Sequence, residues 1–563
     1  MNFRCPQGRP HAVLAWLFAC AAAAQAQTAP PAASPAAPPG APAATASTAP
    51  GPAATPVIEV QRFNVVGNTL LPPEQVQAVL APYRGQRSLE ELQRAAAAVQ
   101  RLYSDAGYGG VVAYLPAQTV GDGVAEIRVV EGRVARINVR GAPGFSESNV
   151  RASVPDLQIG QTPRARRINV QNVIANENPA KRLQVLLKPG EQPGSIDADL
   201  SVDARPLQSM TVAVDDTGTQ RTGRWRIGAT WQNANLTGHD DVLSTQYQTS
   251  PSKPSQVTIL SAGYRLPLYA WLATLDAYLA YANVNAGASA TAAGDVRING
   301  KGRLGGLRMT WYLPVAGELD HRIGLALDRR EYLNNCEVAG LPSGACGPAG
   351  ANVAVTPLSL DYSVQSTGGL RWGADVALSA NLGVGGGDSG QAAFDAIRPG
   401  ARRGYSMLRA TFSAGLPLGE RWQLRTRLAA QGSSDALVPG EQFGIGGANS
   451  VRGYEERELV GDRGLQGTVE LVGPELLGPQ PGQAGLYASL QPLFFVDAGQ
   501  VANVMGAPCN GASARCSLWS LGLGLQFSRG PLQARLAVAQ ARRDGLVTRR
   551  GDRRTHAALS YAF

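Results

Sequence analysis

From about residue 207 to its end, the chain alternates apolar and polar residues with a period of two. This period is typical of half-buried β-strands. In segment 224–231, two tryptophans, an isoleucine and an alanine share one face, and two arginines, a glycine and a threonine share the other. Segments 421–431 and 519–527 repeat the alternation. An apolar outer face, a polar inner face and aromatic residues at strand ends indicate a transmembrane β-barrel.

The alternating region divides into about sixteen candidate strands, an even number, as expected for an antiparallel barrel. They begin near residues 208, 224, 241, 255, 271, 301, 319, 353, 368, 403, 420, 464, 486, 517, 530 and 554. A barrel of this size encloses a lumen too wide for side chains to fill. A soluble β-sandwich also alternates, but it would bury its apolar face against a second sheet. The N-terminal export signal described below and the aromatic last strand favour the membrane.

Residues 57–131 have a different pattern, which predicts a small α+β module. Its expected elements are a strand at 57–65, a helix from 72, a helix from 88 and strands at 109–115 and 124–130. Ser88 and Glu91 have the spacing of a capping box at the start of the second helix. Residues 132–206 repeat the same order. There we expect a strand at 134–140, helices at 146–154 and 164–175, and strands at 183–187 and 195–203.

The N-terminal residues predict export. The apolar run Ala12–Ala24 follows Arg4 and Arg9 and leads into a small-x-small site ending at Ala26. This is typical of a signal peptide, which we place at residues 1–26. Lipidation at Cys20 is the alternative. Residues 27–56 are almost entirely alanine, proline, serine, threonine and glycine, and so predict an extended linker.

Four cysteines remain after such a signal is removed, in two close pairs: Cys336 with Cys346, and Cys509 with Cys516. In an oxidising compartment, pairs of this kind are expected to form disulfides in exposed loops. A metal site is the alternative, but no histidine lies near either pair. We therefore expect two disulfides and no metal.

Charge and motifs argue against several other classes of protein. The formal net charge is +9, but the basic residues are scattered and several lie on one face of predicted strands. This distribution favours a charged lumen over a nucleic-acid patch. Metalloprotease, hydrolase and phosphate-loop motifs are missing from the sequence. We expect a protein that is not an enzyme and that uses no cofactor or nucleotide.

A long glycine-rich segment at about 434–463 carries the candidate functional residues. It contains Val451-Arg452-Gly453-Tyr454 and follows the eleventh predicted strand. A loop of this length is usually functional. Asp497, on the thirteenth strand, has the opposite parity to Phe494 and Val496, so it is expected to point into the lumen. An arginine fork can bind such a carboxylate with two hydrogen bonds. The alternative is that Arg452 is a solvated loop residue and Asp497 one more lumen charge.

These two motifs also carry a resemblance to a known superfamily. Val451–Tyr454 resembles the lid-loop signature of the outer-membrane insertases and transporters, and Phe495-Val496-Asp497 resembles its partner motif on the thirteenth strand. Residues 57–131 and 132–206 resemble two polypeptide-transport-associated (POTRA) modules. Asn178-Pro179 with the later Leu186–Gly190 resembles the second module of one transporter family. Two modules and about sixteen strands resemble the two-partner secretion transporters, which export haemolysin- and haemagglutinin-type exoproteins.

The resemblance implies a domain order and several residue roles. The expected order is a signal peptide at 1–26, a linker at 27–56, POTRA modules at 57–131 and 132–206, and the barrel at 207–563. Arg452 and Asp497 would pair inside the barrel and hold the lid loop in place. Segment 235–241 is similar to the family's first hairpin on the extracellular side. Tyr561 and the terminal Phe563 would form the signal for insertion by the barrel-assembly machinery.

The implied function is an outer-membrane translocase whose modules lie in the periplasm. Its partners would be an unfolded secreted exoprotein, outer-membrane lipid and the barrel-assembly machinery, with no nucleic acid. The family often carries an N-terminal helix that plugs the pore, and residues 27–56 are too rich in proline to form an obvious one. A barrel-assembly insertase and, less favoured, a diffusion porin are the alternative functions. Porins lack POTRA modules, so residues 57–206 argue against a porin.

Overall fold

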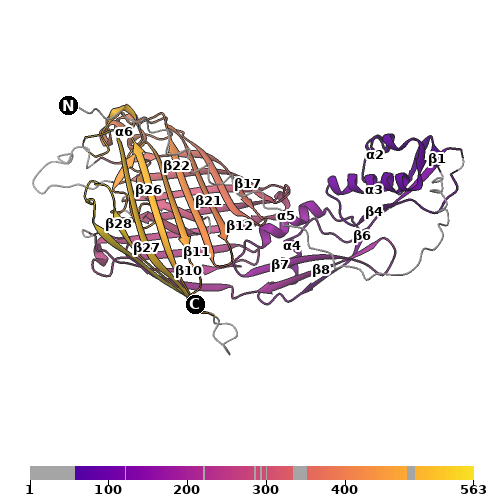
Figure 1. The fold of residues 1–563 in the computed structure, drawn as a ribbon, viewed down its shortest axis with the longest axis horizontal. Helices are drawn as coiled ribbons and strands as arrows, with labels where there is room; N and C mark the ends of the chain where they lie inside the picture. The colour runs from indigo at the N-terminus through magenta and orange to yellow at the C-terminus, as the bar shows by residue number, and fades with distance from the viewer. Residues whose placement is uncertain are drawn as a thin grey trace, which may run out of the picture. The chain divides into compact units, whose positions relative to one another are not determined.

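The computed structural model describes residues 57–120, 122–219, 222–283, 287–291, 294–298, 301–333, 351–478, 488–510 and 512–563. The predicted signal peptide, the linker and the Cys336–Cys346 pair lie outside these described residues. Within them, the chain forms two small α+β modules followed by a closed barrel (Figure 1). None of the helices in the described ranges is long and apolar enough to cross a membrane.

The first module has one three-stranded sheet, ordered β2-β5-β4, with β2 and β5 parallel and β4 and β5 antiparallel. Its elements are β1 (Val57–Val60), β2 (Arg62–Val66), α2 (Pro73–Leu80), β3 (Gly85–Ser88), α3 (Leu89–Asp105), β4 (Val111–Tyr114) and β5 (Val124–Glu131). The predicted capping box at Ser88 and Glu91 is present at the start of α3. The apolar face of α3 packs on the sheet through Leu92, Val99 and Tyr103.

The first predicted strand of this module is wrong in one respect. Residues 57–65 were expected to form one strand, but the chain bends at Gln61, and the two halves belong to different sheets. The backbone N–H groups of Gln61 and Arg62 both donate to the carbonyl of Gly123. This shared acceptor turns the chain, so that β1 pairs with the short strand β3 while β2 pairs with β5.

The second module repeats the arrangement, with a sheet ordered β6-β8-β7. Its elements are β6 (Arg133–Arg140), α4 (Glu147–Ala152), α5 (Ala165–Ala175), β7 (Lys181–Pro189) and β8 (Ser195–Ala204). Strands β6 and β8 are parallel, and β7 and β8 are antiparallel. The predicted element order is confirmed in full. Its core also contains Ala234, Tyr269 and Tyr312 from the barrel, so this module and the barrel share apolar packing.

The barrel is closed by pairing of its last strand with its first. Its strands are β9 (Gln208–Asp215), β10 (Arg226–Asn233), β11 (Val242–Thr249), β12 (Thr258–Leu268), β13 (Ala273–Ala282), β16 (Gly302–Tyr312), β17 (Leu319–Tyr332), β18 (Val353–Val355), β19 (Pro357–Ser366), β20 (Arg371–Asn381), β21 (Ser406–Leu418), β22 (Trp422–Gly432), β25 (Arg463–Val472), β26 (Ala488–Ala502), β27 (Arg515–Arg529), β28 (Leu532–Ala541) and β29 (Arg553–Ala562). Short β18 and β19 both pair with β17 in one continuous register, so they are one strand interrupted at Thr356. The described residues therefore form sixteen antiparallel barrel strands, as predicted.

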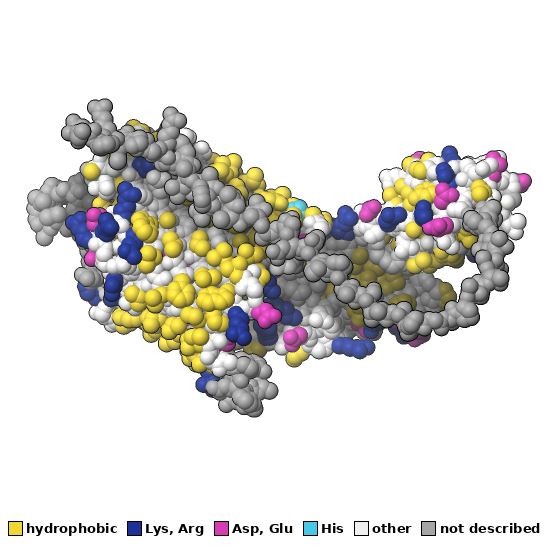
Figure 2. Space-filling view, viewed as in Figure 1, with side chains coloured by type: hydrophobic (Ala, Val, Ile, Leu, Met, Phe, Trp, Pro, Cys, Tyr) yellow, Lys and Arg dark blue, Asp and Glu magenta, His cyan; other side chains and the backbone are white. Residues whose placement is uncertain are grey.

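The outer wall of the barrel is apolar, as the alternation predicts. Figure 2 shows hydrophobic side chains gathered over the barrel strands. Exposed leucines from many strands contribute to this surface: Leu279, Leu307, Leu360, Leu378 and Leu523. In a water-soluble protein such a surface would drive association, whereas in a bilayer it faces lipid chains.

The two ends of the barrel differ. Turns 234–241 and 269–272 lie at the end that packs on the second module, here called the module end. Strand order then places the loops after β20, β22, β26 and β28 at the opposite end, here called the lid end. A short hairpin of β14 (Gly287–Thr291) and β15 (Gly294–Ile298) follows β13, and the helix α6 (Gln391–Ile397) lies in the loop after β20.

Candidate functional site

The loop between β22 and β25, residues 433–462, is the candidate functional segment and is here called the lid. It was predicted at 434–463, one residue later. Two short strands, β23 (Phe443–Ile445) and β24 (Leu459–Gly461), pair with each other and bring its two limbs together. The segment between them carries Val451–Tyr454, all four residues of which are buried. The lid tip is therefore packed within the protein and is not a solvated loop.

Arg452 binds two carboxylates inside the barrel. Its Nε and Nη2 donate to Oδ2 and Oδ1 of Asp497 at 2.7 and 2.8 Å, and its backbone N–H donates to Oδ2 at 3.1 Å. Its Nη1 donates to Oε1 of Glu470 at 2.6 Å. Arg452 is 4% exposed and Asp497 0%. The predicted partners are thus in direct contact, in the bidentate geometry that a planar guanidinium allows.

The strand pleat explains why these side chains meet. Phe494 and Val496 on β26 are 49% and 50% exposed on the outer wall, so Phe495 and Asp497 point inward. The ring centroid of Phe495 lies 3.4 Å from the guanidinium carbon of Arg452, a cation–π contact. Glu470 lies on β25, directly opposite Phe495 in the ladder.

Glu470 was missed in the sequence analysis, although the same parity argument could have found it. Leu465 and Val469 on β25 are exposed outward, so an even-numbered residue of that strand faces the lumen. Its carboxylate also binds Arg535 of β28. Arg452 is therefore part of a group of four charged side chains, and the predicted ion pair is only half of it.

The other residues of the lid motif fill space next to Arg452. Gly453 has φ of 92°, a left-handed conformation that favours glycine. A Cβ there would lie 3.3 Å from that of Ala539, and the Gly453 N–H donates to Nε2 of His556 at 3.1 Å. The hydroxyl of Tyr454 lies 2.8 Å from the carbonyl oxygen of Arg543. Val451 packs in the same apolar cluster as Tyr454.

Three further carboxylates fix the lid toward the lid end of the barrel. Both oxygens of Glu441 accept from Nη1 of Arg330 at 3.0 Å, and Oε1 accepts from Tyr332 at 2.6 Å. Glu458 accepts from the hydroxyl of Thr548, in the loop after β28, at 2.6 Å. The third carboxylate is Asp462. Sequence patterns did not point to any of the three.

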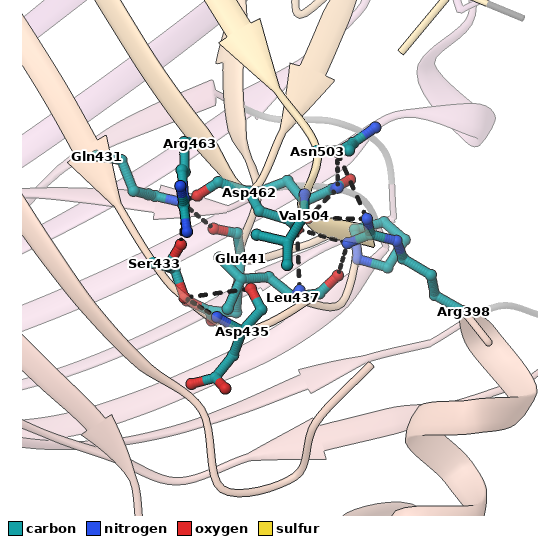
Figure 3. Close-up of polar contacts among 12 residues, drawn as sticks. Arg398, Gln431, Ser433, Asp435, Leu437, Glu441, Asp462, Arg463, Asn503 and Val504 are labelled. Atoms are coloured by element: carbon teal, nitrogen blue, oxygen red, sulfur yellow. Dashed lines mark hydrogen bonds and ion pairs between the residues drawn. The ribbon is translucent and has the colours of Figure 1, made fainter. Parts of the chain in front are cut away.

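Asp462 links three loops at the lid end (Figure 3). It forms an ion pair with Arg398, which follows α6. The backbone N–H of Leu437 donates to Oδ1, and that of Val504 to Oδ2, both at 2.9 Å. Glu441, Glu458 and Asp462 are called the outer anchors below. Together with Arg452 they attach the lid to β17, β25 and β26 and to the loops after β20, β26 and β28.

Cys509 and Cys516 form the predicted disulfide. Its surroundings differ from the prediction, which placed it in an exposed loop. Both cysteines are more than nine-tenths buried and pack in one cluster with Val451 and Tyr454 of the lid. The loop after β26 folds over the lid, and this packing removes the sulfur atoms from solvent.

A second buried polar site joins the second module to the barrel and is here called the junction. Nζ of Lys181 lies 2.6 Å from Oδ2 of Asp240, and both side chains are fully buried. Tyr269 donates to the same Oδ2 at 2.6 Å, as does Ser153 at 2.9 Å. Burial lowers the pKa of the Lys181 ammonium, and the Asp240 carboxylate opposes that shift.

Two of the three residues between α5 and Pro179 extend the junction. Glu177 reaches Arg265, Tyr312 and Arg322, which lie on β12, β16 and β17 of the barrel. Asn178 donates to the carbonyl of Asp240 at 3.1 Å. The Asn178-Pro179 motif found in the sequence thus marks the segment that contacts the barrel.

The junction corrects one prediction. Segment 235–241 was expected to be the first hairpin on the extracellular side, yet it contacts Asn149 and Lys181 of the second module. It therefore lies at the module end. The reason is strand order. Strand β9 runs away from the second module and β10 runs back toward it, so the turn after β10 lies beside the module.

The terminal residues lie on the outer wall. Leu559, Tyr561 and Phe563 are exposed, and the rings of Tyr561 and Phe563 form an edge-to-face pair with centroids 4.7 Å apart. The N–H of Phe563 donates to the carbonyl of Met210 at 2.7 Å. The last residue thus helps to close the barrel against its first strand.

Two family models match the chain. The model for haemolysin secretion/activation proteins ShlB/FhaC/HecB matches residues 194–527, which is more than half of the chain. The model for the POTRA domain of ShlB type matches residues 58–132, which correspond to the first module.

Curated relatives and solved structures agree with this match. The outer membrane transporter CdiB of Dickeya dadantii is 25% identical over 430 residues, covering 73% of this chain and 71% of that protein. The heme/hemopexin transporter protein HuxB of Haemophilus influenzae is 25% identical over 179 residues, 31% of this chain and 32% of that protein. The structure of CdiB from Escherichia coli has the same fold, with a TM-score of 0.74 at 19% identity over 92% of this chain and 93% of that one.

The family is one of outer-membrane transporters with periplasmic POTRA domains, and it is not a family of enzymes. The module end of the barrel is accordingly periplasmic and the lid end extracellular. With the barrel, the module and the lid motif in place, the chain belongs to the haemolysin secretion/activation (ShlB/FhaC/HecB) family of two-partner secretion transporters.

Proposed function

We propose that this transporter exports a large unfolded exoprotein of the haemolysin or adhesin type. In this scheme the POTRA modules capture the exoprotein in the periplasm, the barrel conducts it, and the lid controls passage. The family match supports export, and the names of the relatives, a CdiB transporter and a heme/hemopexin transporter, describe transport. A barrel-assembly insertase remains the second candidate because that class carries a similar lid motif.

The observation that carries the capture step is the free edge of the first module. Strand β4 is an edge of its sheet, and a groove of about 550 Å³ separates it from α3. Within the groove, the N–H of Ala113 donates to the side chain of Gln100 at 3.3 Å. An incoming extended chain can replace this side chain and add a strand to β4, because backbone pairing tolerates varied side chains.

The same topology changes the choice of residues for a test. Sequence alone does not show which strand of a module is exposed, so residues 124–130 and 183–187 are both candidates at that level. Strand β5, which contains 124–130, is central in its sheet, whereas β7, which contains 183–187, is an edge. Proline in β5 would disrupt the sheet itself. Edge substitutions therefore belong in β4 and β7.

Deletion of residues 57–131 tests the proposal. We expect a barrel that still inserts and migrates as a heat-modifiable species but no longer secretes its exoprotein. Ala113→Pro, which removes the edge donor, should lower secretion more mildly, while the matched control Ala113→Ser keeps the donor and should secrete normally.

Two results would count against this proposal. Secretion at the wild-type rate by the deletion variant would show that the first module is not the receptor. A general fall in other outer-membrane barrels in cells carrying the variant would favour the insertase.

A further inference from the structure

A cavity of about 750 Å³ lies beneath the lid tip and reaches the periplasmic rim of the barrel. Its lower wall includes residues of the turn that joins β19 to β20, and its upper end is formed by residues 448–450 and Arg452 of the lid. Residues of β21, β22, β25 and β28 also line it. This space, here called the vestibule, is as large as a typical binding pocket.

The vestibule wall is strongly basic. Five arginines line it, Arg371, Arg425, Arg427, Arg452 and Arg535, against one acid, Glu470. Glu470 is already bound to Arg452 and Arg535, and Arg425 donates to two glutamines. Within the described part of the chain, the side chains of Arg371 and Arg427 have no hydrogen bond or ion pair. Two cations thus face the space without a partner.

The pleat and the neighbouring strands hold Arg371 and Arg427 in place. On β20, Val376 and Leu378 are exposed on the outer wall, so the parity of Arg371 directs it to the lumen. Arg427 lies opposite Thr468 on β25 and Ser413 on β21 in the two ladders. Like charges on one wall of a cavity raise the local potential, and an anionic ligand lowers it.

The junction leaves this side of the periplasmic opening accessible. Among the described residues, the hydrogen bonds and ion pairs between the second module and the barrel fall on β12, β16, β17 and the turns at 234–241 and 269–272. The vestibule is built from β19 to β28. The arginine wall therefore lies on the side of the barrel where, among the described residues, the second module makes no hydrogen bond or ion pair.

We propose that the vestibule binds a carboxylate-bearing extended segment of the exported polypeptide and directs it to the lid tip. The inference rests on the proposed export function and adds a charge preference to it. Carboxylates match the free guanidinium groups of Arg371 and Arg427 in shape and charge. A bound segment also lies next to Glu470 and Arg452, so it can compete for the charges that hold the lid.

Peptide binding by the purified full-length protein in detergent tests this inference. The probes are fluorescein-labelled hexaglutamate and hexalysine, followed by anisotropy at low ionic strength. We expect hexaglutamate to bind and hexalysine not to bind. The double variant Arg371→Gln/Arg427→Gln should weaken hexaglutamate at least fivefold. The matched control Arg549→Gln/Arg550→Gln removes the same charge from an extracellular turn and should change the affinity less than twofold. Added salt should weaken binding, as for charges in a wet site.

Several outcomes would contradict the proposal that the vestibule binds an acidic segment. These are no hexaglutamate binding by the wild type, equal binding of hexalysine, or equal losses in the two double variants. Displacement of hexaglutamate by equimolar tripolyphosphate would show a site for any anion and would also reject a polypeptide site. None of these results affects the secretion test with the 57–131 deletion, so the two proposals can fail separately. Heat-modifiable migration of both double variants establishes that their barrels are folded.

Discussion

Arg452 is a charged side chain almost fully removed from solvent, so its partners decide whether the lid can stay in the lumen. Loss of one partner of a buried pair costs about 3–5 kcal/mol, and less where water enters. Arg452→Ala leaves Asp497 buried without its cation and should cut secretion while the protein remains in the membrane. The charge swap Arg452→Asp/Asp497→Arg should restore part of the secretion.

A double-mutant cycle measures this coupling. Secretion rates of the two single variants and the swap would be compared, and plain additivity of their effects would contradict a functional pair. The structure adds a reason for incomplete rescue by the swap. Glu470 also binds Arg452, and an aspartate at position 452 would face that carboxylate as a like charge.

Glu131 gives a pH-dependent prediction in the first module. Its carboxylate accepts from the N–H groups of Thr69 and Leu70 at 2.7 and 3.0 Å, and from the hydroxyl of Tyr103 at 2.8 Å. Partial burial alone would raise its pKa, but the hydrogen bonds from Thr69, Tyr103 and Leu70 outweigh burial, and the pKa of Glu131 is lowered.

A lowered pKa means that the folded module favours the ionised carboxylate. The stabilisation is therefore complete above the ordinary glutamate pKa and is lost as the pH falls through the folded-state value. Glu131→Gln should destabilise the first module at neutral pH by at most about 1.5 kcal/mol. The difference from the wild type should shrink in acid. Hydrogen exchange of α3, with both proteins compared at the same pH, checks this, and a constant difference would reject it.

The positions of side chains were predicted best where a single local rule determines them. Strand parity placed Asp497 in the lumen, and the capping spacing placed Ser88 at the start of α3. Glu470 follows the same parity rule and was missed only because it lies outside a recognised motif. The outer anchors could not be predicted, because Glu441, Glu458 and Asp462 find their partners on strands or loops far away in the chain.

At the scale of elements, alternation located every barrel strand, and each begins within three residues of its predicted start. Pairing between elements was harder to predict. The bend at Gln61 depends on a carbonyl sixty-two residues away in the chain. The end of the barrel at which segment 235–241 lies depends on how many strands separate it from the second module. Both errors arose where contacts between distant segments decide the structure.

The loop after β26 contains a disulfide bond that packs against the lid. The Cys509–Cys516 disulfide packs against Val451 and Tyr454, so its removal should loosen the lid tip as well as its own loop. A short ring stabilises by about 2–3 kcal/mol at most. The double variant Cys509→Ala/Cys516→Ala should speed hydrogen exchange in residues 443–461.

Mass spectrometry of unreduced peptides provides the first control, because the wild type must contain the bond. Exchange in β12 and β13, which lie outside the cluster, should not change. Unaltered exchange in the lid of the double variant would show that the disulfide acts only within its own loop.

For the whole molecule, we predict that the terminal residue controls how much barrel is assembled. Phe563 closes the wall through its backbone bond to Met210 and exposes its ring on the outer surface. The burial of such a ring is worth only about 1.5–3 kcal/mol. We propose that the barrel-assembly machinery recognises it, so that its deletion should lower barrel levels far more than this energy implies.

Phe563→Ala separates the two roles, since it keeps the backbone bond and removes the ring. Heat-modifiable barrel in outer-membrane fractions should fall in both variants if recognition matters. Normal levels in the alanine variant and low levels in the deletion would instead assign the effect to barrel closure.

The junction has a consequence for building hybrid transporters. Lys181 and Asp240 come from different domains, and each is a fully buried charge whose ion-pair partner is the other. A hybrid cut at the domain boundary near residue 206 would inherit one charge without its counterpart, unless the donor relative happened to carry the same pair. Hybrids that also carry over segment 234–241, and that keep residues equivalent to Arg265, Tyr312 and Arg322 as partners of Glu177, should assemble at normal levels. To change the exported substrate, the first module alone would be swapped. Within the described residues, no buried ion pair joins that module to the barrel.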